Sequence, residues 1–356
     1  MNKPWRLLKG WDHLVSTADG LAVDDCLAHT VSEQGSAPIL HLYRFKPSVI
    51  VGKYQDIEAA LNLDRCRARG VEYNRRSTGG GTVIMGERVV ALGFGISLDH
   101  PRMNRSINAI FRVMSSILIR ALKNLGVEAV FRPKNDLEVE GKKIAGLSAS
   151  SEVGSGILFH CSMLVDFDIP LMLDIMNVPA EKNYEKGYNC FSQRLTTVER
   201  ELGHTVSMDE VMEAIWRSYE EEFQVEFAPD ELSPWEKVKV GELKVSRYED
   251  PRWIFSQRHP RNRMGEALRK TRGGLLQVYL SLSGSIIEQV IITGDFFSSS
   301  ADINRIESVL KWTPAVKQHI LDNLGSVWTE EIIYGVEMEE LAETIVQARI
   351  NGFAAA

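Results

Sequence analysis

A glycine-rich stretch carries the clearest chemical potential in this chain. It runs Arg75-Arg76-Ser77-Thr78-Gly79-Gly80-Gly81-Thr82-Val83. Three consecutive glycines lose more conformational entropy on folding than a purely structural loop normally requires. Because they lack Cβ atoms, they can aim backbone N–H groups at a phosphate or lie flat against a ligand, while an arginine offers a planar fork to an anion. The plainer interpretation is a flexible turn beside two solvated arginines. We expect a ligand-binding loop.

A second polar stretch covers residues 135–146 and has the pattern of two short strands joined at Glu140-Gly141. Side chains alternate along a strand, so only one of Lys142 and Lys143 faces a site. Asp136 is a candidate ligand for Mg²⁺, which takes one or two carboxylates and lets phosphates fill its other positions. Taken as isolated residues, these side chains are more typical of a solvated hairpin edge.

The elements that must position these stretches are indicated by hydrophobic periodicity. An apolar stripe over residues 18–27 follows two cap candidates and predicts a helix, and a longer stripe predicts another over 105–125. Residues 130–167 have the pattern of an antiparallel meander. A capping box, Ser207-x-x-Glu210, opens a helix predicted over 208–223.

The last third of the chain has the pattern of a separate small domain. Periodicity fades over residues 226–270, where four prolines lie among many charges, and this indicates an irregular crossing between domains. Two strands and three helices are predicted after it. We therefore expect a catalytic domain over residues 1–228, an interdomain segment over 229–264 and an accessory domain over 265–356.

Composition narrows the class of protein. The 356 residues include 41 Lys+Arg and 48 Asp+Glu, a formal net charge of −7, so we expect no nucleic-acid partner. We also expect no membrane span, since no run approaches ~20 mostly apolar residues. The first residues lead into no apolar signal region, and the four cysteines are widely spaced, so we expect a cytoplasmic protein with reduced thiols.

Several motifs, in this order and spacing, resemble the lipoate–protein ligase family, in the wider group that includes biotin ligases and octanoyl transferases. The motifs are Gly52-Lys53-Tyr54-Gln55-Asp56, Arg75-Arg76-x-x-Gly79-Gly80-Gly81-x-Val83, Asn135-Asp136-Leu137, Lys143-Ile144-Ala145-Gly146 and, late in the chain, Gly294-Asp295-Phe296-Phe297. The last of these is similar to the ligases' accessory domain. The resemblance implies an α+β fold, with a mixed, largely antiparallel sheet, flanking helices and a small α+β accessory domain.

The resemblance also implies a two-step reaction. Lipoate or octanoate reacts with ATP and Mg²⁺ to give an acyl adenylate, and the acyl group then moves to a lysine of a lipoyl acceptor domain. A carboxylate resists attack by an amine until it has a good leaving group, and adenylation supplies one. The implied acceptor belongs to a 2-oxoacid dehydrogenase E2, a glycine-cleavage-type carrier or a specialised lipoyl protein of sulfur metabolism.

The family's residue roles transfer to matching positions. Lys143 would lie between the acyl carboxylate and the α-phosphate and neutralise charge that develops in both steps. The glycine stretch would run along the acyl chain and the adenylate, with Arg76 facing the ligand and Asp136 serving the metal. The implied binding set is Arg76, Gly79, Gly80, Gly81, Thr82, Val83, Asn135, Asp136, Lys143, Ala145, Gly146 and His160.

Two positions depart from the family pattern. Met85-Gly86 stands where many ligases have His-Asp, so the contact of that histidine must be absent or replaced. His160-Cys161-Ser162 stands where the family often shows His-Gly-Thr, which places a thiol near the expected ligand. A lone histidine on an apolar strand is more often a satisfied core residue than a ligand contact.

Three alternatives to the ligase follow from the same residues. An octanoyl or lipoyl transferase needs a cysteine nucleophile. In the transferases most similar to the ligases it lies in a C-F-x-x-P stretch, which residues 130–136 lack, leaving Cys161 as the substitute. A biotin ligase would carry G-R-G-R-x-G, which is not found here. A catalytically silent scaffold that binds acyl groups or nucleotide is suggested by Met85-Gly86, but the presence of Lys143 and Asp136 argues against it.

Overall fold

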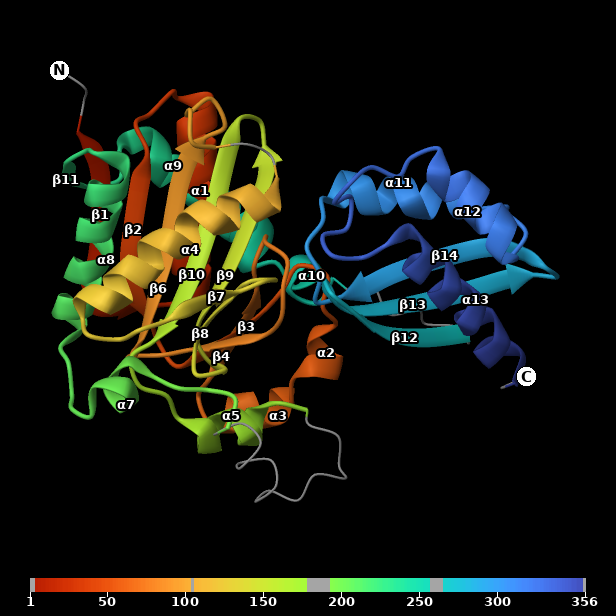
Figure 1. Cartoon of the computed structure of the whole chain (residues 1–356), viewed down its shortest axis with the longest axis horizontal. Helices are drawn as coiled ribbons and strands as arrows, with labels where there is room; N and C mark the ends of the chain where they lie inside the picture. Colours follow the sequence, from red (N-terminus) through yellow and green to blue (C-terminus); the bar gives the residue numbers. More distant parts are fainter. Residues whose placement is uncertain (1–3, 104–105, 178–192, 257–264, 355–356) are drawn as a thin grey trace. The chain divides into compact units, whose positions relative to one another are not determined.

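The computed structural model of the chain divides into two compact units (Figure 1). It describes residues 4–103, 106–177, 193–256 and 265–354. The first unit comprises Met1–Ile50, Ile57–Ser77 and Val83–Ile254. The second comprises Val51–Asp56, Thr78–Thr82 and Phe255–Ala356. The glycine stretch is thus grouped with the second unit, whereas the Asp136 and Lys143 hairpin belongs to the first.

The first unit is built on an eight-stranded sheet of order β11-β1-β2-β6-β10-β9-β8-β7. Only β11 with β1 and β1 with β2 pair in parallel; the other neighbours are antiparallel. This confirms the mixed, largely antiparallel sheet and the meander. The strands are β1 (Trp5–Val15), β2 (Ile39–Phe45), β6 (Val89–Ser97), β7 (Val130–Arg132), β8 (Asp136–Val139), β9 (Lys142–Val153), β10 (Gly156–Leu164) and β11 (Phe227–Asp230).

Helices cover both faces of this sheet (Figure 1). Helix α1 (Thr17–Glu33) packs on β6 and β10, and helices α4 (Ile107–Asn124) and α8 (Met208–Phe223) pack together on the other face. All three begin where the sequence predicts, because Ser16, Ser106 and Ser207 cap their first turns. Short helices α5 (Ile169–Ile175) and α7 (Val198–Leu202) follow β10.

Two glycines of β6 bring α1 unusually close to the sheet. A Cβ atom at Gly93 would overlap the Asp24 carboxylate, and one at Gly95 would lie 2.7 Å from Cβ of Leu27. Because both positions are glycine, an acidic side chain of α1 can reach the strands.

A second, three-stranded sheet of order β4-β3-β5 completes the first unit. It consists of β3 (Ser48–Val51), β4 (Glu72–Arg75) and β5 (Val83–Met85). The arginine-rich segment between β3 and β4 forms two short helices, α2 (Ile57–Ala60) and α3 (Leu63–Ala68). They are separate because Leu61 pairs with Met176 and Asn62 caps a new helix.

The expected interdomain segment over 229–264 is helical in part. It contains α9 (Pro234–Leu243), the π-helical turn η1 (Lys244–Tyr248) and α10 (Pro251–Ile254), all in the first unit. Pro234 and Pro251 occupy the first helical position, where a missing N–H costs nothing. A capping box of Ser233 and Glu236 also opens α9. Two of the four prolines that suggested irregular chain, Pro234 and Pro251, instead begin helices, while Pro229 lies in β11 and Pro260 lies outside the described residues.

The second unit has its own core between an antiparallel sheet and three helices. The sheet order is β12-β13-β14, formed by β12 (Gly265–Thr271), β13 (Gly274–Ser283) and β14 (Ile286–Gly294). The helices are α11 (Ser300–Leu310), α12 (Lys317–Gly325) and α13 (Met338–Ala354). The expected small α+β arrangement is confirmed, with β12 as an additional strand. In the part of the chain described, no helix is long and apolar enough to cross a membrane.

Candidate functional site

Lys143 and Asp136 form an ion pair on neighbouring strands of the first unit. Nζ of Lys143 lies 2.8 Å from Oδ1 of Asp136, and the two side chains are 30% and 24% exposed. The backbone of Lys143 is held as well: its N–H donates to the Arg194 carbonyl, and its carbonyl accepts from Thr196 N. The Lys143 amine therefore has a fixed orientation, and it is exposed enough to bind an incoming anion.

An irregularity in strand pairing gives Lys143 this orientation. Asp136 pairs with Gly146 and Leu137 with Ala145, but the register then shifts so that Glu138 lies opposite Lys143. Such a bulge re-aims a side chain relative to a regular ladder. A Cβ atom at Gly146 would fall 2.9 Å from Nζ of Lys143, so the glycine leaves room for the amine.

Asn135 and Ala145, two further residues expected at the site, lie in the same hairpin and hold its strands together. The Asn135 side chain donates through Nδ2 to the Leu147 carbonyl at 2.8 Å, and the Asn135 carbonyl accepts from Leu147 N at 2.7 Å. Ala145 is fully buried. The structure thus brings Asn135, Asp136, Lys143 and Gly146 together at one end of β8 and β9.

The two arginines before the glycines are both buried, at 1% and 6% exposed. Nε of Arg75 donates to the carbonyls of Trp253 and Ile254 at 3.1 and 3.2 Å. Nη1 of Arg76 lies 3.4 Å from the Ile50 carbonyl. Arg75 is therefore a structural residue of the first unit, and Arg76 contacts a different partner.

The glycine stretch packs closely against the backbone of Phe296 in the second unit. The Gly80 N–H donates to the Phe296 carbonyl at 3.1 Å, and a Cβ atom at Gly79 would lie 2.5 Å from that same oxygen. Gly80 has φ of +94°, which favours glycine by itself. Oγ1 of Thr82 donates to Oε1 of Gln55 at 3.1 Å. The glycines therefore have structural requirements that the sequence did not reveal.

His160 belongs to a buried polar cluster on the α1 side of the sheet. Its Nε2 lies 3.1 Å from Oδ2 of Asp24, a residue that is only 2% exposed. Oδ2 also accepts from Oη of Tyr43 at 2.7 Å, and Oδ1 accepts from Nδ1 of His41 at 2.8 Å. Burial alone raises the pKa of Asp24, but hydrogen bonds from His160 and His41 outweigh it and hold the pKa at about 2. An ionised carboxylate is thus stabilised inside the fold.

Sequence reasoning missed Asp24 and two of its partners, His41 and Tyr43, although it singled out His160. A usable signal existed, because Asp24 and Asp25 follow Leu21 and Ala22 on the buried stripe of the predicted helix, where acidic residues need partners. Met85, which stands where the family often has histidine, is buried in the apolar cluster that includes Leu21, Ile50 and Val89.

The cysteines of the described residues are poor nucleophiles. Cys26, Cys66 and Cys161 are all buried. Burial raises the pKa of Cys161 to about 12 and that of Cys26 to about 11, so neither is a thiolate near neutral pH. Cys190 lies outside the described residues.

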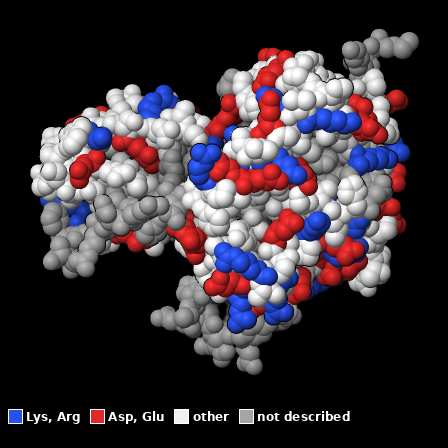
Figure 2. Space-filling model, turned by 180° about the vertical axis from the view of Figure 1, so that it is seen from behind, with Lys and Arg blue, Asp and Glu red and all other residues white. Residues whose placement is uncertain are grey.

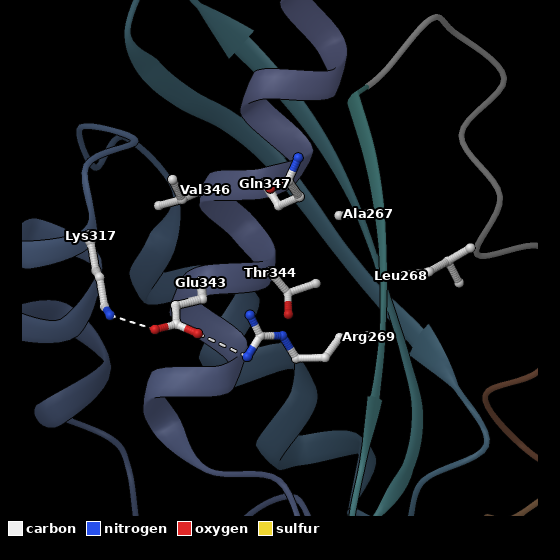
Figure 3. A pocket seen from close by; sticks show the side chains of 8 residues that line it. All are labelled: Ala267, Leu268, Arg269, Lys317, Glu343, Thr344, Val346 and Gln347. Carbon is white, nitrogen blue, oxygen red and sulfur yellow. Dashed lines mark hydrogen bonds and ion pairs between the residues drawn. The ribbon is translucent and has the colours of Figure 1, made fainter.

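Cavities and surface charge show where else ligands could be held. A cavity of about 410 Å³ in the first unit is lined in part by Asp25, Ser77 and Arg247. In the second unit, Figure 3 shows a pocket of about 300 Å³ where Arg269 and Lys317 point toward Glu343, at 2.9 and 2.7 Å. On the face drawn in Figure 2, basic and acidic side chains are interspersed over the described residues.

Comparison with known families covers both units. Residues 16–220 match the lipoyl protein ligase A/B catalytic domain, and residues 266–345 match the bacterial lipoate protein ligase C-terminus. Among curated relatives, octanoyltransferase LipM of Brevibacillus brevis is 27% identical over 69% of this chain and 99% of its own length. Lipoate-protein ligase A subunit 1 of Thermoplasma acidophilum is 30% identical over 67% of this chain and 92% of its own length.

Solved structures that are similar to this chain point to the same family. A bipartite lipoate protein ligase described with its E2 lipoyl domain from Thermoplasma acidophilum has a TM-score of 0.63 and 28% identity, covering 73% of this chain and 100% of that one. Lipoate-protein ligase A bound with ATP has a TM-score of 0.61 and 26% identity, covering 72% and 99%. LipL1 of P. falciparum, at 19% identity, has the same fold over 96% of this chain and 99% of that one, with a TM-score of 0.74. The chain therefore belongs to the lipoyl protein ligase A/B family, whose enzymes are lipoate ligases and related acyl transferases.

Proposed function

We propose that this chain is an ATP-dependent lipoate–protein ligase. The observation that carries the proposal is that one polypeptide joins the Lys143 hairpin to a unit matching the lipoate protein ligase C-terminus. The LipM relative spans 69% of this chain, which is less than the two units together. The ligase structure described with bound ATP is also similar to this chain.

In the first step, a carboxylate oxygen of lipoate or octanoate attacks the α-phosphorus of ATP and pyrophosphate leaves. Lys143 supplies positive charge to the acyl carboxylate and the α-phosphate as negative charge develops there. In this structure its amine is paired with Asp136, a partner that it must exchange for substrate oxygens. Asn135 holds the start of β8 against β9 so that both charged groups keep their place.

Asp136 is the residue that would hold Mg²⁺, which neutralises phosphate charge when bound. The donor set fits only a metal that brings other ligands with it. Asp136 provides one partly exposed carboxylate, and within the described residues no group of three metal-ligating side chains is found. Mg²⁺ commonly binds in this way, through one or two carboxylates and the phosphates of a nucleotide.

In the second step, the ε-amine of an acceptor lysine attacks the acyl carbonyl, AMP leaves, and the amine loses a proton as the amide forms. Lys143 again stabilises the negative charge on the carbonyl and phosphate oxygens. We propose a lipoyl domain as acceptor: an E2 of a 2-oxoacid dehydrogenase, a glycine-cleavage-type carrier or a specialised lipoyl protein of sulfur metabolism. The related archaeal ligase, described with its E2 lipoyl domain, supports this class of partner.

A choice of acyl donor tests the proposal. An apo-lipoyl domain is incubated with the protein and either free lipoate with MgATP or an octanoyl thioester of a carrier protein, and its mass is measured. We expect modification only with lipoate and ATP, and loss of it in Lys143→Ala. Lys142→Ala is the matched control, since the neighbouring lysine lies opposite Val139 rather than beside Asp136.

A cysteine-dependent octanoyl transferase is the second candidate, favoured by the similarity to LipM over 99% of that protein's length. It requires a thiolate, whereas the described cysteines are buried. Modification from the octanoyl thioester without ATP would select the transferase and contradict the ligase.

A further inference from the structure

The segment that enters the glycine stretch is tied to the end of the first unit by its backbone and side chains. Asn74, which is 2% exposed, donates through Nδ2 to the Tyr248 carbonyl at 2.9 Å. Nε of Arg75 donates to the Trp253 and Ile254 carbonyls, and the indole Nε1 of Trp253 donates back to the Arg75 carbonyl at 2.9 Å. Two consecutive residues are thus both held by the segment that ends the first unit.

Asp25 extends this connection to Ser77. The Ser77 hydroxyl donates to Oδ1 of Asp25 in a short hydrogen bond. Oδ2 of Asp25 accepts from Nη1 of Arg247 at 2.5 Å and from Oη of Tyr248 at 2.6 Å. The Arg247 guanidinium also lies 4.8 Å from the ring centroid of Trp253. A single buried carboxylate therefore links the residue before Thr78 to η1.

We propose that residues 247–254 form a clasp that positions Arg76 for the ligase reaction, and that Tyr248 and Trp253 are its positioning residues. This inference rests on the proposed function. Arg76 has clasped residues on both sides, Arg75 and Ser77, so its backbone has little freedom to move. Nε of Arg75 donates into the clasp, whereas Nη1 of Arg76 lies 3.4 Å from the Ile50 carbonyl, so the clasp engages one guanidinium group and leaves the other to different partners.

The site of the clasp suits this role better than a general role in stability. It borders the cavity of about 410 Å³ that is lined by Asp25, Ser77 and Arg247. It also includes the last two residues of η1, and single π-helical turns occur frequently at functional sites. A catalytic site needs its binding groups held within a fraction of an ångström, and supporting hydrogen bonds together with packing achieve this.

Two conservative variants test the clasp. Trp253→Phe removes the indole donor while keeping an aromatic ring beside Arg247, and Tyr248→Phe removes only the hydroxyl that bonds Asp25. Trp235→Phe is the matched control, because Trp235 packs from α9 against the same apolar cluster as Trp253. Each full-length protein is examined by hydrogen–deuterium exchange of residues 74–82 and by lipoate-dependent pyrophosphate release.

Losing one hydrogen bond of about 1 kcal/mol corresponds to roughly a fivefold effect. We expect about fivefold faster exchange in residues 74–82 for both variants and a similar rise in KM for ATP and lipoate. The kcat value should stay within about twofold, and Trp235→Phe should match the wild type. A merely structural role would lower the unfolding temperature and the active fraction without changing KM.

If hydrogen–deuterium exchange in residues 74–82 is unchanged in both variants, residues 247–254 do not hold this segment, and the clasp proposal is wrong whatever the activity. Faster exchange with unchanged KM overturns its positioning role. If the wild-type protein releases no pyrophosphate, the proposed ligase function is wrong. The exchange comparison still decides whether residues 247–254 hold residues 74–82.

Discussion

At the scale of single residues, Lys143 is the side chain on which the proposed reaction depends most, and distant contacts hold it in place. The hairpin motif pointed to Lys143, and the structure places that amine beside Asp136. The register shift that orients it depends on pairing between β8 and β9 and on contacts with Arg194 and Thr196. Those contacts are made by a distant part of the chain, so local periodicity could not predict them.

Gly146 offers a test of the lysine's position. In Gly146→Ala, the new methyl group would fall 2.9 Å from Nζ of Lys143 and displace the flexible end of that side chain. We expect pyrophosphate release to slow by about tenfold, or ~1.4 kcal/mol in activation free energy, with little change in unfolding temperature. Gly241→Ala, where the added atom meets open space, is the control. A normal rate in Gly146→Ala would show that the lysine does not need this position.

The buried Asp24 carboxylate predicts a specific pH dependence of stability. Its pKa is about 2 in the folded protein and 3.8 as an ordinary value. A lowered pKa contributes stability above the unfolded value, and the contribution is lost as pH falls through the folded value. Asp24→Asn should therefore be less stable than the wild type at pH 7 by about 2 kcal/mol. The gap should close between pH 4 and pH 2. Urea unfolding measured across pH tests this, and a gap that widens on acidification would contradict it.

At the scale of elements, the strongly periodic helices were predicted correctly, while the proline-containing segment after residue 229 was misread in part. The stripes of α1, α4 and α8 give clear signals because one face of each helix is buried. The prolines of α9 and α10 looked like breakers, since their place at a helix start depends on capping partners. The glycine stretch looked like a ligand wall, but Gly79 and Gly80 are also required by Phe296 and by a positive φ.

Gly81 separates the two roles of the glycine stretch. Val or Ala at Gly80 would be strained by its φ of +94°, so lost stability there says nothing about a ligand. At Gly81 an added Cβ would lie 3.8 Å from Oδ2 of Asp295, which is ordinary contact. We expect Gly81→Ala to keep its unfolding temperature within a few degrees and to bind an acyl adenylate analogue about tenfold more weakly, or ~1.4 kcal/mol. Unchanged calorimetric affinity would remove Gly81 from the binding site.

At the scale of the whole molecule, the sequence could not predict which of the two compact units certain short segments join. Residues 51–56 and 78–82 lie early in the chain and are nevertheless grouped with the second unit. Tyr54 shows why: its ring stacks on Phe296 at 5.1 Å, and its hydroxyl donates to the Ser298 carbonyl. Contacts between residues more than 200 positions apart leave no local pattern.

The cysteines test the choice between ligase and transferase for the molecule as a whole. Cys161→Ser and Cys190→Ser should each retain most lipoate ligase activity, because adenylation needs no thiolate. Assays with lipoate, MgATP and an apo-lipoyl domain measure this. A fall of several orders of magnitude in either variant, with an acyl thioester trapped on the wild type, would support covalent catalysis instead.

The most direct test of the ligase proposal omits the acceptor entirely. Purified protein is mixed with ATP, Mg²⁺ and lipoate, and pyrophosphate is measured in the wild type, Lys143→Ala and Lys142→Ala. We predict lipoate-dependent release by the wild type and by Lys142→Ala, and its loss in Lys143→Ala with an unchanged unfolding temperature, since a partly exposed ion pair contributes at most about 1 kcal/mol to stability. No lipoate-dependent pyrophosphate from the wild type, or undiminished release from Lys143→Ala, would contradict the proposal.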